Sequence, residues 1–158
     1  MTRRERMTVV LGAVILSAAT QLPADPPPPP VPDFTQPGEI AKVNRELTFN
    51  LGSTGLRGWI YHKPMTHFDG LQGRTTDAAR QILVTHVGKG SPADGCVQVD
   101  DVILGTGGKP FSADARKSFA LAIQQAETEA AGGVLKMTIW RAGQTLPVQI
   151  KLRVMGTY

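Results

Sequence analysis

The sequence predicts an α+β domain in which five to six short antiparallel strands form a partly open barrel or sandwich, capped by one short and one long helix. Two alternating segments carry most of this prediction, because residues 135–140 and 146–154 place an apolar side chain at every second position. An amphipathic segment at 113–130 supplies the long helix. The strands and helices do not alternate as β-α-β units, which argues against a parallel sheet.

The remaining strands are expected from short apolar runs. They are predicted at residues 47–50, 59–62, 82–87 and 102–104. Aromatic and β-branched residues favour the strand at 59–62. The nearly continuous apolar run at 82–87 is typical of a central strand. The Gly-rich segment 105–108 and the segment 141–144 each indicate a hairpin connection.

Both helices carry start and stop signals. Ser91 can cap a short helical turn, Pro92 suits its first position and Gly95 can end it. For the long helix, Ser112 is the expected cap, and Asp114 complements the dipole at the N-terminus. One apolar stripe runs along this helix, formed by Ala115, Phe119, Ala122, Ile123 and Ala126. Two glycines at 132–133 end it.

Composition limits the chemistry open to the chain. Its 158 residues are 41% hydrophobic and 19% charged, as in an ordinary globular domain. The net charge is +4, and half of it lies in the first 24 residues, which leaves no basic stripe for nucleic acid. Cys96 is the single cysteine, expected to be an inert core thiol. Neither a Gly-x-Ser-x-Gly nor a His-Glu-x-x-His motif is present, so we expect no catalysis, no metal and no cofactor.

The N-terminus reads as an export signal. Three arginines at positions 3, 4 and 6 precede an apolar run at 7–19, which is the length of a signal-peptide core and too short for a membrane span. Residues 1–24 are therefore predicted as a signal peptide of a periplasmic or secreted protein. Cleavage is expected after Ala24, with Ala19 as the rival site and an uncleaved membrane anchor as the alternative.

A proline-rich linker is predicted at 25–46. Five consecutive prolines from residue 26 fix an extended polyproline II segment. The expected role is a spacer, the alternative being a ligand for SH3- or WW-type modules. The folded domain is then predicted at 47–155. It contains a long connection at 63–81, for which two interpretations stay open: a lid over the edge of a binding groove, or a structural addition without a binding role.

The middle of the chain resembles a PDZ domain. Residues 88–93 read Gly-Lys-Gly-Ser-Pro-Ala after an apolar strand, Asp-Val-Ile-Leu follows at 101–104, and Gly-Gly-Lys-Pro at 107–110 precedes the long helix. The order is that of PDZ domains in bacterial secreted proteases of the high-temperature-requirement class, with Asp100 and Gly107 where glycine and asparagine are usual. Residues 51–61 also resemble the start of large uncharacterised bacterial secreted proteins that contain a PDZ domain, of which this chain is then expected to be a fragment.

The resemblance implies a peptide groove between the strand at 59–62 and the helix at 113–130. A partner's extended segment or C-terminus adds to the strand, and successive backbone N–H groups bind a terminal carboxylate. Gly58, Trp59 and Ile60 would supply these donors, and Arg57 would add charge. The family usually has an aliphatic or aromatic residue at the position of Arg57. This departure indicates a groove that is occluded or specialised. The full set of expected groove residues is Leu56, Arg57, Gly58, Trp59, Ile60, Tyr61, Arg116, Phe119, Ala120 and Ile123.

The function that follows is a non-catalytic protein- or peptide-binding module. Its expected partner is a peptide C-terminus, or an extended segment of another protein or of the chain's own C-terminal continuation. Two alternatives stay open: the regulatory domain of a larger secreted protease or hydrolase, and a structural module that packs on a following domain. The resemblance also implies that Arg116, Ala120 and Ile123 line the helix wall of the groove, and that Phe119 lies at the groove floor or in the core.

Overall fold

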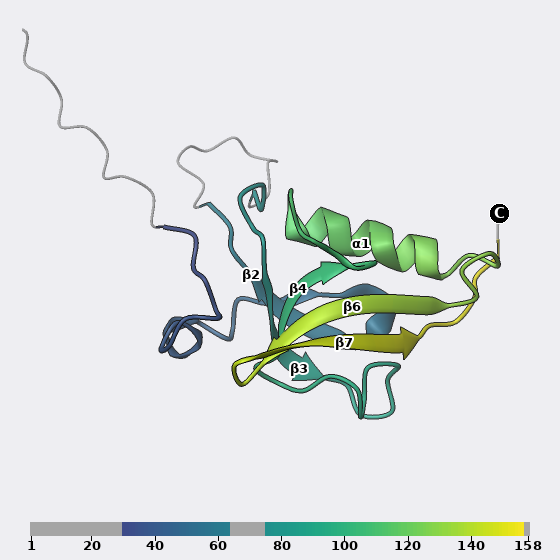
Figure 1. Cartoon of the computed structure of the whole chain (residues 1–158), viewed down its shortest axis with the longest axis horizontal. Helices are drawn as coiled ribbons and strands as arrows, with labels where there is room; N and C mark the ends of the chain where they lie inside the picture. The colour runs from purple at the N-terminus through teal and green to yellow at the C-terminus, as the bar shows by residue number, and fades with distance from the viewer. Residues whose placement is uncertain (1–29, 64–74, 157–158) are drawn as a thin grey trace, which may run out of the picture.

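The computed structural model of the chain describes residues 30–63 and 75–156. One helix, α1 (Ala115–Ala126), lies on one side of an antiparallel sheet (Figure 1). The strands are β1 (Phe49–Asn50), β2 (Leu56–Ile60), β3 (Ile82–Val87), β4 (Val102–Thr106), β5 (Lys109–Pro110), β6 (Val134–Arg141) and β7 (Gln144–Lys151). Two short 3-10 helices, η1 (Ile40–Lys42) and η2 (Gly52–Thr54), precede β1 and β2 respectively.

The sheet confirms the predicted α+β class. Its strands are ordered β1-β2-β3-β4-β6-β7, with β5 paired to β4, and every pairing is antiparallel. Within the described residues β1 and β7 stand at opposite ends of this order, so the sheet is open and does not close into a barrel. Two of its strands, β1 and β5, are only two residues long.

The β6–β7 hairpin is the longest pairing and was the clearest signal in the sequence. Its ladder runs from Val134 opposite Lys151 to Arg141 opposite Gln144. Ala142 and Gly143 form the two-residue connection, and both have positive φ, at 48° and 88°. A two-residue turn with two positive φ values matches the right-handed twist of the strands that it joins.

The main core lies between the sheet and α1. The helix contributes the predicted stripe, with Ala115, Phe119, Ile123 and Ala126 buried. The facing side chains are Leu56 and Ile60 from β2, Ile82 and Val84 from β3, Ile103 from β4, and Leu135, Met137 and Ile139 from β6. Each of these strands contributes alternate residues, as a sheet with one face toward a helix requires.

The opposite face of the sheet is covered by residues 33–43, which we call the N-terminal strap. Phe34 is 1% exposed and packs with Leu83 and Val102. Its ring meets Trp59 edge-to-face, with 5.5 Å between the ring centroids. The backbone N–H of Phe34 also donates to the Gln81 side chain at 2.8 Å. Part of the range predicted as linker therefore folds against the domain.

Asp33 fastens the start of the strap. Its carboxylate accepts hydrogen bonds from the Gln81 side chain at 2.8 Å and from the Thr35 hydroxyl at 2.7 Å. These bonds, that from Gln81 first, lower the pKa of Asp33 from its usual 3.8 to about 2. The strap is thus joined by polar contacts to Gln81, the residue before β3, beside its apolar contact with Leu83 in that strand.

The helix boundaries differ from the prediction of 113–130. Asp114, rather than Ser112, caps α1: its φ and ψ are −49° and 107°, outside the helical region, and its carboxylate accepts from the N–H groups of Arg116 and Lys117. At the other end the helix stops at Ala126, and Thr128 folds back to donate its hydroxyl to Gln125 O at 2.7 Å. The structure also shifts the bounds of one predicted strand and corrects two further expectations.

The predicted strand at 59–62 is β2 at 56–60, so it begins three residues earlier and includes Gly58. The expected short helix at 91–95 is a series of turns, in which Asp94 N–H donates to Ser91 O and Cys96 N–H to Ala93 O. Cys96 itself is exposed, not in the core. A run of apolar neighbours is a weak signal of burial where the chain turns rather than extends.

Candidate functional site

The loop before β2 is a rigid turn built around Thr54. This side chain is fully buried, and its hydroxyl donates to Leu51 O at 2.8 Å and accepts from Leu56 N–H at 3.1 Å. Gly55 follows with φ at +77°, and a Cβ on it would lie 2.1 Å from Ser91 Cβ. Only glycine fits there, both for its backbone conformation and for its close approach to the 88–93 turn.

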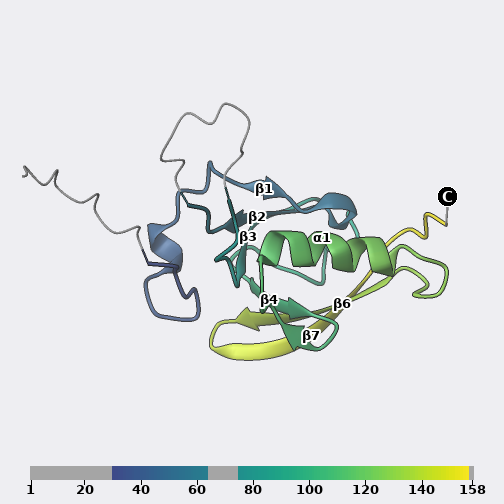
Figure 2. The ribbon, with the colours of Figure 1, turned by 90° about the horizontal axis from the view of Figure 1, so that it is seen from above.

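The outer edge of β2, away from β3, is occupied by the chain's own residues. Strand β1 pairs antiparallel with this edge, with Phe49 opposite Gly58 and Asn50 opposite Arg57. The N–H of Leu51 continues the ladder by donating to Leu56 O at 3.0 Å. Figure 2 shows β1 beside β2 at this end of the sheet.

The same segment lies along α1. The Arg116 guanidinium sits over the Phe49 ring, 4.7 Å from its centroid. A Cβ on Gly52 would be 3.3 Å from Ile123 Cδ1, two turns further along the helix. Ser53 donates its hydroxyl to the Glu127 carboxylate at 2.5 Å, at the C-terminal cap. Residues 49–53 therefore fill the space between the β2 edge and α1, running in the direction of the helix.

Arg57 is committed to this segment. Its Nε donates to Thr48 Oγ1 at 3.0 Å and its Nη2 to Thr48 O at 3.3 Å. Its side chain lies on the face of β2 opposite Leu56 and Gly58, as strand alternation requires. The guanidinium that was expected to assist a bound carboxylate is hydrogen-bonded to Thr48, the residue before β1.

Gly58 has a packing role that the sequence did not show. A Cβ on it would lie 2.6 Å from Ile82 Cγ2 and 3.1 Å from Leu51 Cδ1. The absence of a side chain leaves room for Leu51, which is 4% exposed. Leu51 is thus seated in the core through the space that Gly58 leaves in β2.

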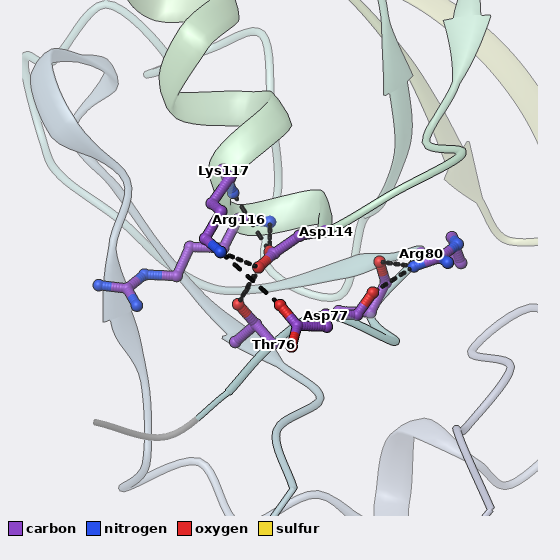
Figure 3. Close-up of polar contacts among 7 residues, drawn as sticks. Thr76, Asp77, Arg80, Asp114, Arg116 and Lys117 are labelled. Carbon is purple, nitrogen blue, oxygen red and sulfur yellow. Dashed lines mark hydrogen bonds and ion pairs between the residues drawn. The ribbon is translucent and has the colours of Figure 1, made fainter. Parts of the chain in front are cut away.

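The N-terminus of α1 is fixed by the end of the 63–81 connection. The buried Thr76 donates its hydroxyl to both carboxylate oxygens of Asp114, at 2.8 and 2.7 Å, and Ala115 N–H donates to Ala79 O at 3.0 Å. Figure 3 shows the contact between Thr76 and Asp114, with Lys117 near Asp77 and Asp114 and with the Arg116 side chain extended away from them. The part of the connection expected to act as a lid, 64–74, lies outside the described residues.

The ten predicted groove residues do not form one lining. Arg57 and Arg116 hold residues 48 and 49, whereas Leu56, Gly58 and Ile60 are buried on the core face of β2. Phe119 and Ile123 belong to the core, Ala120 is exposed, and Tyr61 is 7% exposed. Trp59 points to the opposite face. There it meets Phe34 and helps to line a cavity of about 400 Å³ with Pro32, Val43, Tyr61 and His62.

An ion pair that the sequence did not indicate stabilises the start of β4. The Asp101 carboxylate is 2% exposed and accepts two hydrogen bonds from Arg141, each at 2.7 Å. It also accepts from Gln98 N–H at 2.7 Å. The hydrogen bond to Asp101 raises the pKa of Arg141 above its usual value. The sequence offers no signal that pairs Asp101 with Arg141, which lies 40 residues further along the chain.

A comparison with protein families identifies the domain. The family model for the PDZ domain matches residues 59–140, slightly more than half of the chain. The chain belongs to the PDZ-domain family. PDZ domains are generally non-catalytic modules that bind peptide segments of proteins. The match begins at residue 59, within β2. Strand β1 and the turn around Thr54 therefore precede the part of this PDZ domain that the family model covers.

No curated protein matches the chain. In residues 30–63 and 75–156 no helix is both long and apolar enough to cross a membrane. In the same residues, no group of three or more His, Cys, Asp and Glu side chains is placed to hold a metal ion. The predicted signal peptide at 1–24 and the prolines before residue 30 lie outside the described part of the chain.

Proposed function

We propose that this PDZ domain binds an extended peptide by strand addition at the outer edge of β2, alongside α1. The observation that carries the proposal is the antiparallel pairing of Phe49 and Asn50 with that edge. An antiparallel strand is what an added peptide would form, and its direction along α1 leads toward the turn at Gly55. No catalytic step is part of the proposal.

Main-chain hydrogen bonds would give much of the affinity, and side chains at alternate positions would give the specificity. Such a short ladder supports a micromolar complex, which corresponds to about −8 kcal/mol. The helix wall would contribute Arg116, because its guanidinium reaches over the strand that lies on β2.

The test is a titration of the purified chain with a random peptide library, in which each ligand is compared as a free acid and as its C-terminal amide. We expect saturable binding, with backbone amide shifts in NMR spectra concentrated in 56–60 and in α1. Loss of binding on amidation would assign the groove to free C-termini. No binding, or shifts confined to the cavity beside Trp59, would contradict the proposal.

A second candidate is a structural module whose groove stays filled. The occupation of the β2 edge by β1 favours it, because a groove filled permanently by its own chain needs no free peptide. In that case no library peptide binds, and exchange of the β1 amides is as slow as that of the central strands. A regulatory domain of a larger protease or hydrolase is a further proposal, which rests on the resemblance of the motifs alone.

We also propose that the protein is exported. Export is supported by the basic and apolar pattern of residues 1–24. N-terminal sequencing of the mature protein is expected to find a chain that begins after Ala24, or after Ala19. A mature protein that keeps all of residues 1–24 would contradict cleavage and favour the membrane-anchored alternative.

A further inference from the structure

The segment on the β2 edge occupies the place of a ligand. Residues 48–51 run antiparallel to β2 and in the direction of α1, and they end at the turn around Thr54. An added peptide that points its C-terminus at this loop would follow the same course. The contacts of this resident segment therefore indicate which ligand the groove is built to take.

Each residue of the segment meets a particular partner. The hydroxyl and carbonyl of Thr48 accept from Arg57, and the Phe49 ring lies between Arg116 and His62, whose ring centroid is 6.3 Å away. Asn50 is exposed and makes the sharp turn by accepting from Gly52 N–H at 2.9 Å. Leu51 is buried against Gly58. The pattern is an aromatic side chain followed by a leucine two residues later.

The contacts of the turn around Thr54 suit a bound segment that continues past the turn, and not a segment that ends there in a carboxylate. The Leu56 N–H, at the start of β2, already donates to the Thr54 hydroxyl. The Arg57 guanidinium, at the second residue of β2, donates to the uncharged Thr48. After Leu51 the chain passes on through η2, where Ser53 donates to Glu127. None of these contacts involves a negative charge at the C-terminal end of the resident segment.

The segment is held in a way that permits release. Strand β1 has two residues, the half-buried Phe49 and the exposed Asn50, and β2 retains its second neighbour β3 when β1 leaves. The contacts through Arg57, Arg116 and Ser53 involve exposed side chains, which are individually weak. Two features oppose release: Leu51 is buried beside Gly58, so a displacing ligand must supply a leucine in its place, and tethering gives the segment a high effective concentration at the groove.

We propose that residues 48–51 are a built-in competing ligand, and that the external ligands of this groove are internal extended segments with an aromatic-x-Leu pattern that displace it. The inference rests on the proposed function, and names the ligand class and the regulation of the same site. Free C-termini are then not required, and binding strength depends on how firmly β1 holds its place.

One test releases the resident segment. The probe is a peptide of residues 45–52, acetylated and amidated so that it carries no terminal charges. Phe49→Ala is expected to raise the affinity of the chain for this peptide at least about tenfold. The control Leu47→Ala, an exposed residue just before β1, leaves it unchanged. Alanine at either the aromatic or the final leucine of the peptide weakens binding. Failure of Phe49→Ala to bind the peptide would overturn the inference.

A second test locks the segment in place and does not depend on a destabilising variant. Asn50→Cys and Arg57→Cys, in a Cys96→Ser background, place two thiols at opposite residues of a non-hydrogen-bonded pair, where side chains are closest. The oxidised form is expected to bind library peptides at least about tenfold more weakly than the reduced form.

The outcomes of this comparison separate the two proposals. Equal binding by the oxidised and reduced forms would overturn the built-in ligand while leaving a peptide-binding function elsewhere on the domain. Absence of library binding by both forms would contradict the proposed function itself, and absence of binding by the reduced form to the 45–52 peptide as well would overturn both.

Discussion

At the scale of single residues, buried polar contacts join parts of the chain that are distant in sequence. Asp101 and Arg141 lie 40 residues apart and connect the start of β4 to the end of β6. Thr76 and Asp114 connect the 63–81 connection to the cap of α1. A buried carboxylate is stable only when its hydrogen-bonding partners are present, so loss of one partner costs more than the contact itself.

Arg141→Met is therefore expected to destabilise the domain by about 3 kcal/mol, because it leaves the Asp101 carboxylate buried without its charged partner. Urea unfolding followed by circular dichroism measures the change. The matched control is Arg153→Met, at an exposed position near the C-terminus, for which a change within about 0.5 kcal/mol is expected. Equal stabilities of the two variants would show that the pair is dispensable.

Asp33 gives a pH dependence of known sign. Folding lowers its pKa from 3.8 to about 2, so its contribution is present above pH 3.8 and is lost as the pH falls through about 2. Because Asp33 is exposed, we expect less than about 1 kcal/mol after solvent screening. At pH 6, Asp33→Asn is expected to be less stable than the original chain, and this difference shrinks toward pH 2. Glu129→Gln, at an exposed site, is the control. A difference that does not change with pH would refute the assignment.

At the scale of elements, the sequence predicted types better than boundaries. The alternation in 135–140 and 146–154 identified β6 and β7, because one face of each strand is more buried than the other. The start of β2 was missed, since Arg57 and Gly58 read as a loop, whereas the close approach of Ile82 requires a glycine within the strand. The helix was predicted too long at both ends because Asp114 acts as the cap and Thr128 bonds back to Gln125.

The turn of the β6–β7 hairpin carries a correctable strain. Ala142 has φ at 48°, a conformation that alanine adopts at a cost of about 1 kcal/mol and that asparagine tolerates better. Ala142→Asn is expected to stabilise the domain by about 0.5 kcal/mol, seen as a rise in the midpoint of urea unfolding. The same substitution at Ala113, exposed and without positive φ, serves as the control. A loss of stability on Ala142→Asn would contradict the turn geometry.

At the scale of the whole molecule, the sheet is covered on both faces. Helix α1 covers one face and the N-terminal strap covers part of the other. The sequence placed the strap in a linker, because it follows the proline run, its composition is polar and mixed, and a single Phe34 gives no periodic signal. The place of β1 was equally hidden: residues 47–50 were predicted as a strand, but neither periodicity nor spacing tells which edge a two-residue strand will join.

Phe34→Ala is expected to destabilise the domain by about 3 kcal/mol, because it empties a fully buried site on the second face of the sheet. Thermal unfolding measures the effect. Val31→Ala, which alters an exposed side chain just before the strap, is expected to change stability by less than about 0.5 kcal/mol. If the two variants unfold alike, the strap is a linker and the domain begins after it.

The central claim is that the outer edge of β2 is a peptide groove held by the chain's own β1. Hydrogen exchange of individual amides, measured by NMR with and without a saturating library peptide, tests it most directly. The Leu51 amide, which donates to Leu56 O, is expected to be protected in the free domain and to exchange faster when the peptide binds, while the β2 amides stay protected. Exchange at Leu51 that does not respond to a bound peptide would contradict the claim.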